Sequence, residues 1–383
     1  MAQSILILGG GVGGLVAANE LRKALPTQHR IILVEREPTF VFAPSLLWLM
    51  TGGRTAEQIS RPLVSLEKQG IEVVRGEIQR IDAERREVVV NGHVLAGDFL
   101  IVALGAELGS ETIPGLAEAG HNFYTLAGAE GLRDALKRFT GGRLVVLTAA
   151  PAYKCPAAPY EAAMLLEYYL RKRRLRALTR VDLYAAEPGP MGVAGPDVSK
   201  AVRQMVEAKD ITYHPEHQIA AVDPATRRLT FANGVESACD LLAYVPPHRA
   251  PRVVRECGLA AESGWIAVDR LTLETGYERV FALGDVVSIP LKLGKPLPKA
   301  GVFAHAEAGV VAGNIVHAIT GKGRPATFDG LGECFIETGD GKAGFGRGDF
   351  YAEPVPAMKL HPPGRHWHAG KVLFEKDWLR RWF

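Results

Sequence analysis

Cys155 is the residue whose surroundings most favour chemistry. It lies in the run Lys154-Cys155-Pro156, directly before a predicted helix from about Ala157 to Leu175. A neighbouring cation and the positive end of a helix dipole both lower the pKa of a thiol, which would make this cysteine a nucleophile or a redox group. The alternative is a small buried residue, which is the commoner fate of a free cysteine.

A glycine-rich turn near the N-terminus predicts a dinucleotide site. It joins a predicted strand, Ser4 to Leu8, to a predicted helix, Leu15 to Leu25. Such a turn bends tightly, lets a pyrophosphate approach the backbone and presents the N–H groups of the helix. Glu35 follows about 20 residues on, placed to accept hydrogen bonds from an adenosine ribose. The glycines of the turn are Gly9, Gly11, Gly13 and Gly14.

Two later segments add to this site. A predicted strand ends at Gly284-Asp285, whose carboxylate would reach a ribityl hydroxyl, and the N-terminus of a predicted helix, Ala304 to Ile319, could stabilise negative charge on a flavin. These features predict an FAD domain that is split in the sequence. Noncovalent FAD is expected, because no cysteine or histidine lies between Pro38 and Met50. The other expected cofactor contacts are Arg36, Pro44, Ile78, Ala103, Gly105, Lys299 and Gly301.

A second nucleotide-like unit keeps the architecture without the glycines. A predicted strand, Arg143 to Thr148, leads into a turn, 149–161, that holds three prolines and no glycine, and the return strand ends near Glu187. Bulky side chains would block a pyrophosphate, and prolines remove N–H donors. We therefore expect no NAD(P)H there, and Cys155 stands where a second cofactor would have met the flavin.

Composition excludes several classes of protein. The 383 residues are 47% hydrophobic and 23% charged, and a net charge of +3 is too small to argue for nucleic acid. The four cysteines lack metal-type pairing, so no metal site is expected. Neither a secretory signal nor an apolar run of about 18 residues is recognised, so a cytoplasmic-side location without a membrane span is expected.

The predicted elements define an α/β fold with two Rossmann-like domains and a C-terminal contact region. We expect the FAD domain at 1–110 and 263–322, the second Rossmann-like domain at 111–262, and the C-terminal region, with Cys334 and an amphipathic tail, at 323–383. Asn91-Gly92 predicts a hairpin turn after the strand Glu87 to Val90. The apolar segment Leu46 to Met50 could equally cover a bound ring or pack.

The chain resembles the sulfide:quinone oxidoreductase and flavocytochrome c sulfide dehydrogenase group of flavoproteins over essentially its whole length. The motifs that carry the resemblance are GGGVGG with Glu35, DFLIVALGA, KCPAAPYE, YVPPHRAP, VFALGD, PKAGVFAHAEAG and GECFIE. The combination of KCPAAPYE with GECFIE is specific to sulfide oxidisers. The resemblance implies bound FAD, a redox disulfide between Cys155 and Cys334 beside the flavin, and Glu161 near the sulfide site. It also gives quinone-site candidates, namely Phe335, Phe345 and Lys371.

Two departures from the group concern how sulfur and protons move. The stretch Phe123 to Ala127 lacks the third cysteine of many membrane-bound members, and the stretch Gly189 to Val193 lacks the histidine of some members. The release of sulfur and the proton route to quinone therefore do not carry over. Three C-terminal histidines could relay protons or be ordinary surface residues. They are His361, His366 and His368.

The expected function is oxidation of sulfide to sulfane sulfur or polysulfide, with electrons passing through FAD to a membrane quinone. The tail from Val372 to Phe383 predicts an amphipathic helix that could lie in the headgroup region, although docking on the protein's own core or on a partner stays open. The protein would then be peripheral to the membrane, and a homo-oligomer is left open. The alternatives are a sulfide dehydrogenase that reduces a cytochrome c, an NADH:quinone reductase, and a non-enzymatic flavoprotein.

Overall fold

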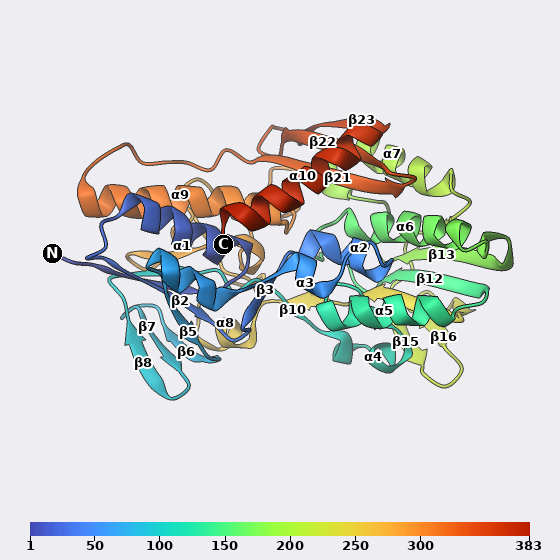
Figure 1. The fold of residues 1–383 in the computed structure, drawn as a ribbon, viewed down its shortest axis with the longest axis horizontal. Coiled ribbons are helices and arrows are strands. Elements are labelled where there is room, and N and C mark those ends of the chain that lie inside the picture. The colour runs from blue at the N-terminus through green and yellow to red at the C-terminus, as the bar shows by residue number, and fades with distance from the viewer.

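The structure is a computed structural model that describes residues 1–383, and a five-stranded parallel sheet forms its N-terminal half (Figure 1). The strand order is β20-β9-β1-β2-β5, so a strand near residue 280 joins a sheet that begins at residue 4. Strands β1, β9 and β20 and most of β2 are apolar and buried on both faces, as in parallel sheets covered on two sides, whereas the edge strand β5 is partly exposed. Their bounds are β1 (Ser4–Leu8), β2 (Arg30–Glu35), β5 (Glu72–Arg75), β9 (Phe99–Val102) and β20 (Val280–Ala282).

Two helices pack together on the first sheet, α1 (Val12–Ala24) and α9 (Gly301–Thr320) (Figure 1). By length and composition α9 could cross a membrane, which the sequence analysis did not recognise. Its apolar side, however, is buried in the core that contains the first sheet, with Phe303, Val311 and Ile315 among the buried residues. The helix therefore serves as a core element in this fold.

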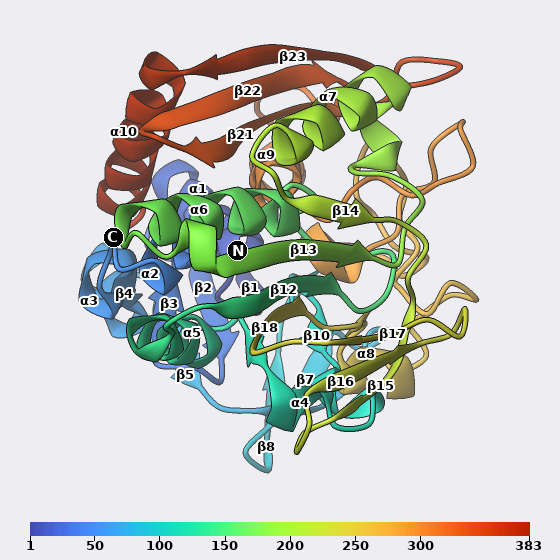
Figure 2. The same ribbon diagram turned by 90° about the vertical axis from the view of Figure 1, so that its right-hand side faces the viewer.

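A second five-stranded sheet follows the order β11-β18-β12-β13-β14, again with parallel pairing. Three helices share a core with one face of this sheet, and the small sheet β15-β16-β17 packs on the other face (Figure 2). The strands are β11 (His121–Asn122), β12 (Gly142–Thr148), β13 (Thr179–Ala185), β14 (Thr212–His214) and β18 (Leu241–Val245). The helices are α5 (Leu126–Arg138), α6 (Ala158–Lys172) and α7 (Pro196–Glu207).

The C-terminal region is an antiparallel sheet followed by a long helix. It consists of β21 (Leu331–Gly339), β22 (Lys342–Asp349), β23 (Ala357–Gly364) and α10 (Arg365–Arg381). Strand β21 packs on α6, and α10 runs from this sheet back to the N-terminal half of the molecule (Figures 1 and 2). This region thus spans the two parallel sheets.

The apolar side of α10 packs on the protein's own core. Trp378, Leu379 and Trp382 are buried, and the ring of Trp378 stacks on Phe40 at 5.0 Å between ring centroids. Of the two alternatives left open by the sequence, the headgroup region and the protein's own core, these three residues take the core. Only the outward turn remains available to other molecules, with Leu373 67% exposed and Phe374 48% exposed.

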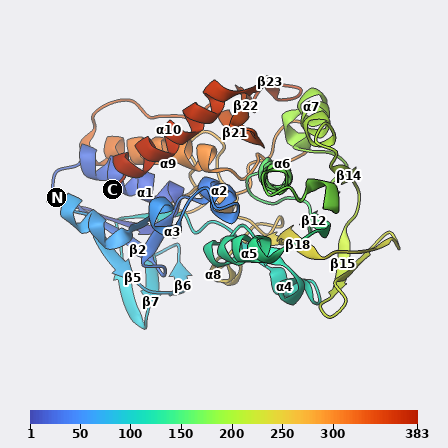
Figure 3. The same cartoon turned by 45° about the vertical axis from the view of Figure 1, so that its right-hand side comes forward.

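Shorter elements complete the chain. The segment Leu46 to Met50 forms α2, which is fully buried and lies beside α5 and α6 (Figure 3), so it packs in the core. Asn91-Gly92 joins β7 to β8 in a hairpin, as expected. The other helices are α3 (Ala56–Ile59), α4 (Leu116–Ala119) and α8 (Arg252–Glu256). The other strands are β3 (Thr39–Val41), β4 (Ser60–Pro62), β6 (Ile78–Asp82), β7 (Glu87–Val90), β8 (His93–Ala96), β10 (Glu107–Leu108), β15 (Ile219–Asp223), β16 (Arg228–Phe231), β17 (Glu236–Ala238) and β19 (His248–Arg249).

A buried ion pair fastens α10 to the segment around α2, and its loss should cost stability. Glu375 is 3% exposed, lies 2.7 Å from Arg54 Nη2 and accepts a hydrogen bond from Ser45. We expect Arg54→Ala to lower the free energy of unfolding by about 3–5 kcal/mol, because it leaves a buried carboxylate without a counter-ion. Equilibrium urea unfolding measures this change.

The matched control is the exposed pair of Arg380 with Asp377 on the same helix, at 2.7 Å. Solvent screens this pair, so Arg380→Ala should change the free energy of unfolding by about 1 kcal/mol or less. Equal losses in Arg54→Ala and Arg380→Ala would contradict a fastening role for Glu375.

Candidate functional site

Two positions of the first glycine turn, Gly9 and Gly14, leave no room for a side chain. Gly9 has φ +102°, and a Cβ there would lie 2.4 Å from the carbonyl oxygen of Ala103. A Cβ at Gly14 would lie 1.9 Å from the carbonyl oxygen of Gly9. At Gly11, in contrast, a Cβ would meet nothing within 4 Å. The turn is therefore packed tightly against the protein and open on its outer side, which is the shape that a pyrophosphate site requires.

The expected cofactor residues converge because four parallel strands end side by side. Ala103 donates its N–H to Leu8 at 2.8 Å, and Leu283 donates to Val102 at 3.0 Å, so the strand ends that carry Gly9, Gly105 and Gly284 are neighbours. Glu35 ends β2, and its carboxylate accepts the N–H of Gly10 at 2.6 Å. Ligands of open parallel sheets bind at this edge.

The outlying cofactor candidates are less closely tied to that edge. Ile78 follows Gly76, whose N–H donates to the Glu35 carbonyl at 3.0 Å. Arg36 is exposed and lies 3.7 Å from Glu37, and Pro44 is exposed ahead of α2. Gly13 accommodates Leu283, because a Cβ at Gly13 would lie 2.2 Å from Leu283 Cδ1. Gly301 begins α9 beside Val12 of α1.

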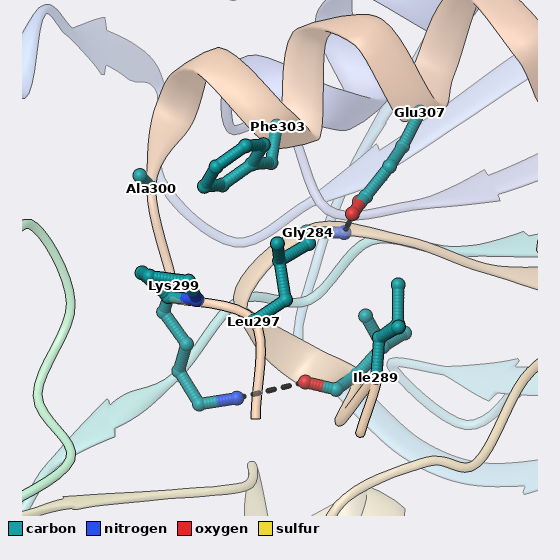
Figure 4. A pocket seen from close by; sticks show the side chains of 9 residues that line it. Gly284, Ile289, Leu297, Lys299, Ala300, Phe303 and Glu307 are labelled. Atoms are coloured by element: carbon teal, nitrogen blue, oxygen red, sulfur yellow. Dashed lines mark hydrogen bonds between the residues drawn. The ribbon is translucent and has the colours of Figure 1, made fainter. Parts of the chain in front are cut away.

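Lys299 and Glu307 flank a small cavity beside the Gly284-Asp285 turn (Figure 4). Lys299 Nζ donates to the carbonyls of Asp285 and Val287 at 2.7 and 2.8 Å, and burial lowers its pKa to about 8. Glu307 accepts the Gly284 N–H at 2.6 Å, and burial raises the pKa of this carboxyl to about 7. The sequence analysis missed Glu307, although a carboxylate inside an apolar helix was visible there.

The two cysteines of the redox hypothesis lie close together, as free thiols in this structure. Cys155, with φ +50°, precedes α6, and its N–H donates to the Lys299 carbonyl at 2.6 Å. Cys334 lies in β21, which packs on α6. Burial raises the pKa of the Cys334 thiol, and negative charge on Cys155 adds to the rise, as expected for neighbouring thiols. The peptide of Lys299 links this pair to the edge where the cofactor candidates gather.

The expectation that Cys155 has a lowered pKa is wrong. Burial raises the pKa of its thiol to about 12, and the carboxylate of Glu161 adds to the rise. The N–H of Ala158 at the start of α6 does lower the pKa, but desolvation outweighs it. The cation that acts on both thiols is Lys371, on α10, and Lys154 is absent from the groups that lower the pKa of Cys155.

Glu161, the expected sulfide-site residue, forms a buried ion pair with Lys371. Glu161 is 2% exposed and Lys371 is 6% exposed. Lys371 Nζ lies 2.8 Å from Glu161 Oε1. The same carboxylate oxygen accepts the backbone N–H of Glu337 at 2.8 Å. The pair therefore joins three elements, α6, β21 and α10, around the two thiols.

The quinone-site candidates lie on β21, β22 and α10, where the C-terminal sheet meets the helix. Phe335 and Phe345 are half-buried neighbours with ring centroids 5.1 Å apart, and Phe345 stacks on Trp367 at 4.5 Å. Phe335 also packs near Gly370, so the aromatic cluster adjoins Lys371 along the helix. A flat apolar ring has suitable stacking partners here. Trp367 was missed at the sequence level, because its contact with Phe345 joins a helix to a strand.

Side chains of the second nucleotide-like unit fill the place of a ribose. The carboxylate of Glu187 accepts hydrogen bonds from Thr148 at 2.8 Å, from Tyr160 at 2.7 Å and from Tyr153. Tyr153 and Tyr160 are 7% and 0% exposed. Because three hydroxyls already satisfy the acid that would hold a ribose, the filled site agrees with the expected absence of NAD(P)H binding.

The segment without the third cysteine carries a buried tyrosine. Tyr124 donates its hydroxyl to the carbonyls of Lys154 and Cys155, at 2.9 and 3.2 Å, and so fixes the turn before α6. His248 packs edge-on against Tyr124 at 5.7 Å. Burial lowers the pKa of His248 to about 3, so this histidine is neutral at physiological pH.

The two Rossmann-like sheets, with a dinucleotide turn on the first and a cysteine pair at the second, define a flavin-dependent disulfide reductase type of protein. The sequence profile of the pyridine nucleotide-disulphide oxidoreductase family matches residues 3–309. The chain belongs to this family, whose members bind FAD.

Individual relatives add detail. The chain is 28% identical to a sulfide-quinone reductase of Aquifex aeolicus, over 99% of this chain and 91% of the relative. A crystal structure of the sulfide:quinone oxidoreductase from Aquifex aeolicus superimposes with a TM-score of 0.90 at 27% identity, covering 100% and 91% of the two chains. An alternative NAD(P)H-ubiquinone oxidoreductase of Arabidopsis thaliana is 26% identical over 96% of this chain and 76% of the relative.

The carboxylate of Glu161 should control how fast the thiols react. Because its charge raises the pKa of Cys155 and of Cys334, Glu161→Gln should lower both pKa values and increase the thiolate fraction. We expect faster alkylation of the reduced protein by iodoacetamide at mildly alkaline pH, measured by mass spectrometry of the two peptides.

Glu333→Gln is the control, because Glu333 is an exposed acid next to Cys334 in sequence. It should leave both alkylation rates unchanged. Slower alkylation in Glu161→Gln, with retained FAD and an unchanged melting temperature, would show that Glu161 does not set the thiol pKa.

Proposed function

We propose that this protein binds FAD noncovalently at the first glycine turn and oxidises sulfide to sulfane sulfur or polysulfide, passing the electrons to a membrane quinone. The observation that carries the proposal is the placement of two thiols beside a buried carboxylate, tied through the Lys299 peptide to the edge of the cofactor sheet. The relatives named for sulfide and quinone support the same substrates.

The fit to FAD rests on residues of the first sheet. The open face over Gly11 would receive the pyrophosphate, and Glu35 would hold the ribose. The N-terminus of α9, at Gly301, would face the flavin ring together with Lys299. Bound FAD supplies a two-electron acceptor that can be reoxidised by quinone.

The protein's own groups would then handle sulfur and protons. Cys155 and Cys334 form the disulfide that a sulfide nucleophile attacks, and Glu161 accepts the proton that the nucleophile loses. Lys371 holds the Glu161 carboxylate in place, because the ammonium lies 2.8 Å away. The resulting persulfide is buried, and burial protects it from water.

Quinone would bind at the aromatic cluster of Phe335, Phe345 and Trp367, which adjoins Lys371. Leu373 and Phe374, exposed on the outer turn of α10, would contact the membrane that supplies the quinone, and Lys376 on the next turn would meet headgroups. This makes the protein peripheral to the membrane, on its cytoplasmic side, through one short patch.

An NADH:quinone reductase is the competing function, since one relative carries that activity in its name. The occupied acid at Glu187 argues against it. A nicotinamide dinucleotide would have to displace Tyr153 and Tyr160 from a half-buried carboxylate and leave their buried hydroxyls unpaired.

The cysteine pair gives the most direct test. We expect Cys155→Ser and Cys334→Ser each to keep FAD yet lose sulfide-dependent flavin reduction by about three orders of magnitude, because either loss removes the whole covalent relay. Anaerobic stopped-flow absorbance measures flavin bleaching. Cys239→Ser and Cys257→Ser are controls that should react like the parent. Near-parent turnover in Cys334→Ser would overturn the proposed relay.

A second prediction separates the two functions. Millimolar NADH should leave the flavin absorbance of the parent unchanged over many turnovers of the sulfide reaction, because the second nucleotide site is filled. The same stopped-flow instrument records both reactions. Flavin bleaching by NADH at a catalytic rate would favour the quinone reductase that uses nicotinamide.

A further inference from the structure

A buried group of charges connects the thiol site to the protein surface. From the inside outward it contains the carboxylate of Glu161, the ammonium of Lys371, the carboxylate of Glu337 and the imidazole of His368. Lys371 Nζ lies 2.8 Å from Glu161 Oε1, and His368 Nδ1 lies 3.0 Å from both carboxylate oxygens of Glu337. Glu337 is 1% exposed, whereas the side chain of His368 is 33% exposed.

The formal charges of this group do not balance. Two carboxylates face one lysine, so the group carries a net charge of −1 unless it binds a proton. An unbalanced charge is costly in a buried environment, which favours a proton on Glu337. Burial raises the pKa of Glu337, which agrees with a bound proton.

The surrounding elements do not supply the missing charge. On α10, Glu375 is already neutralised by Arg54, which stacks over Trp48 at 4.5 Å. Trp48 also contacts the edge of His368 at 5.9 Å, and Lys371 lies over the same ring at 5.1 Å. The remaining titratable neighbours on α6 and β21 are the two thiols, which are protonated at neutral pH because burial raises their pKa.

We propose that Glu337 and His368 form the outlet through which protons released at the Cys155–Cys334 site reach solvent. This inference rests on the proposed sulfide oxidation and assigns two positioning residues to it. The backbone N–H of Glu337 donates a hydrogen bond to the Glu161 carboxylate, and the side chain of Glu337 interacts electrostatically with Lys371. His368 is the member of the group that reaches the surface.

The step that releases the proton balances as follows. A hydrogen sulfide molecule forms a bond to one sulfur of the disulfide, the bond between the two cysteine sulfurs breaks, and the second cysteine leaves as a thiolate with the electron pair. The products are a persulfide, a thiolate and one proton, so the sulfide sulfur is oxidised and the disulfide is reduced. The departing cysteine, whose pKa burial raises, holds that proton until its electron pair is passed on. Glu161 then takes the proton, its attraction for Lys371 weakens, and Lys371 turns to Glu337. The proton on Glu337 then leaves through His368.

The test uses the FAD-loaded full-length protein and compares two variants. We expect His368→Ala to slow sulfide-dependent flavin reduction about a hundredfold, the lower end of what acid–base groups contribute, and free imidazole in the buffer to restore the rate. Glu337→Gln should slow the reaction as much, without rescue by imidazole, because the transfer is cut deeper inside. His366→Ala, at an exposed histidine on the same helix, should react like the parent.

Dithionite reduces flavin without using the thiols, so its rate should be the same in every variant. A His368→Ala protein that keeps the parent rate, or whose loss imidazole does not restore, overturns the outlet while leaving sulfide oxidation intact. A parent protein that dithionite reduces but sulfide does not overturns the proposed function itself. The two failures are therefore distinguishable in one set of stopped-flow traces.

Discussion

The ion pair between Glu161 and Lys371 is the interaction on which the site depends. It joins the first turn of α6, in the second sheet's layer, to the middle of the C-terminal helix, and the N–H of Glu337 adds β21 to the same carboxylate. Because both charges are buried, neither element can move without leaving an unpaired charge, a cost of several kcal/mol. The pair thereby holds Cys334 against the turn that carries Cys155.

Burial explains the chemistry that the thiols are suited to. With pKa values raised far above neutrality, the reduced cysteines are poor nucleophiles in the resting site. A disulfide in the same place carries no charge, so burial does not destabilise it. The environment therefore favours attack on the oxidised pair by an incoming sulfur nucleophile, and it requires a nearby base for the released proton. In the proposed reaction that base is Glu161, which is paired with Lys371 at 2.8 Å.

The second Rossmann-like unit shows how a cofactor site can be lost while its fold is kept. The parallel strands β12 and β13 still end at the expected edge, and Glu187 still follows the second of them. The hydroxyls of Tyr153, Tyr160 and Thr148 occupy this half-buried acid, so it is satisfied without a ligand. In the proposed function, the cysteine turn stands where a nicotinamide would otherwise bind.

The sequence by itself determined the parallel sheets, the first glycine turn and the candidate cysteines, because apolar runs, glycine spacing and helix starts are local signals. It misjudged the pKa of Cys155 and left open what the apolar side of α10 packs against. Both depend on which residues from distant segments surround a group: desolvation and Glu161 outweigh the helix dipole, and Phe40 covers Trp378. Only the tertiary structure decided that Lys371, Glu337 and His368 meet Glu161, since 210 residues separate the ion pair.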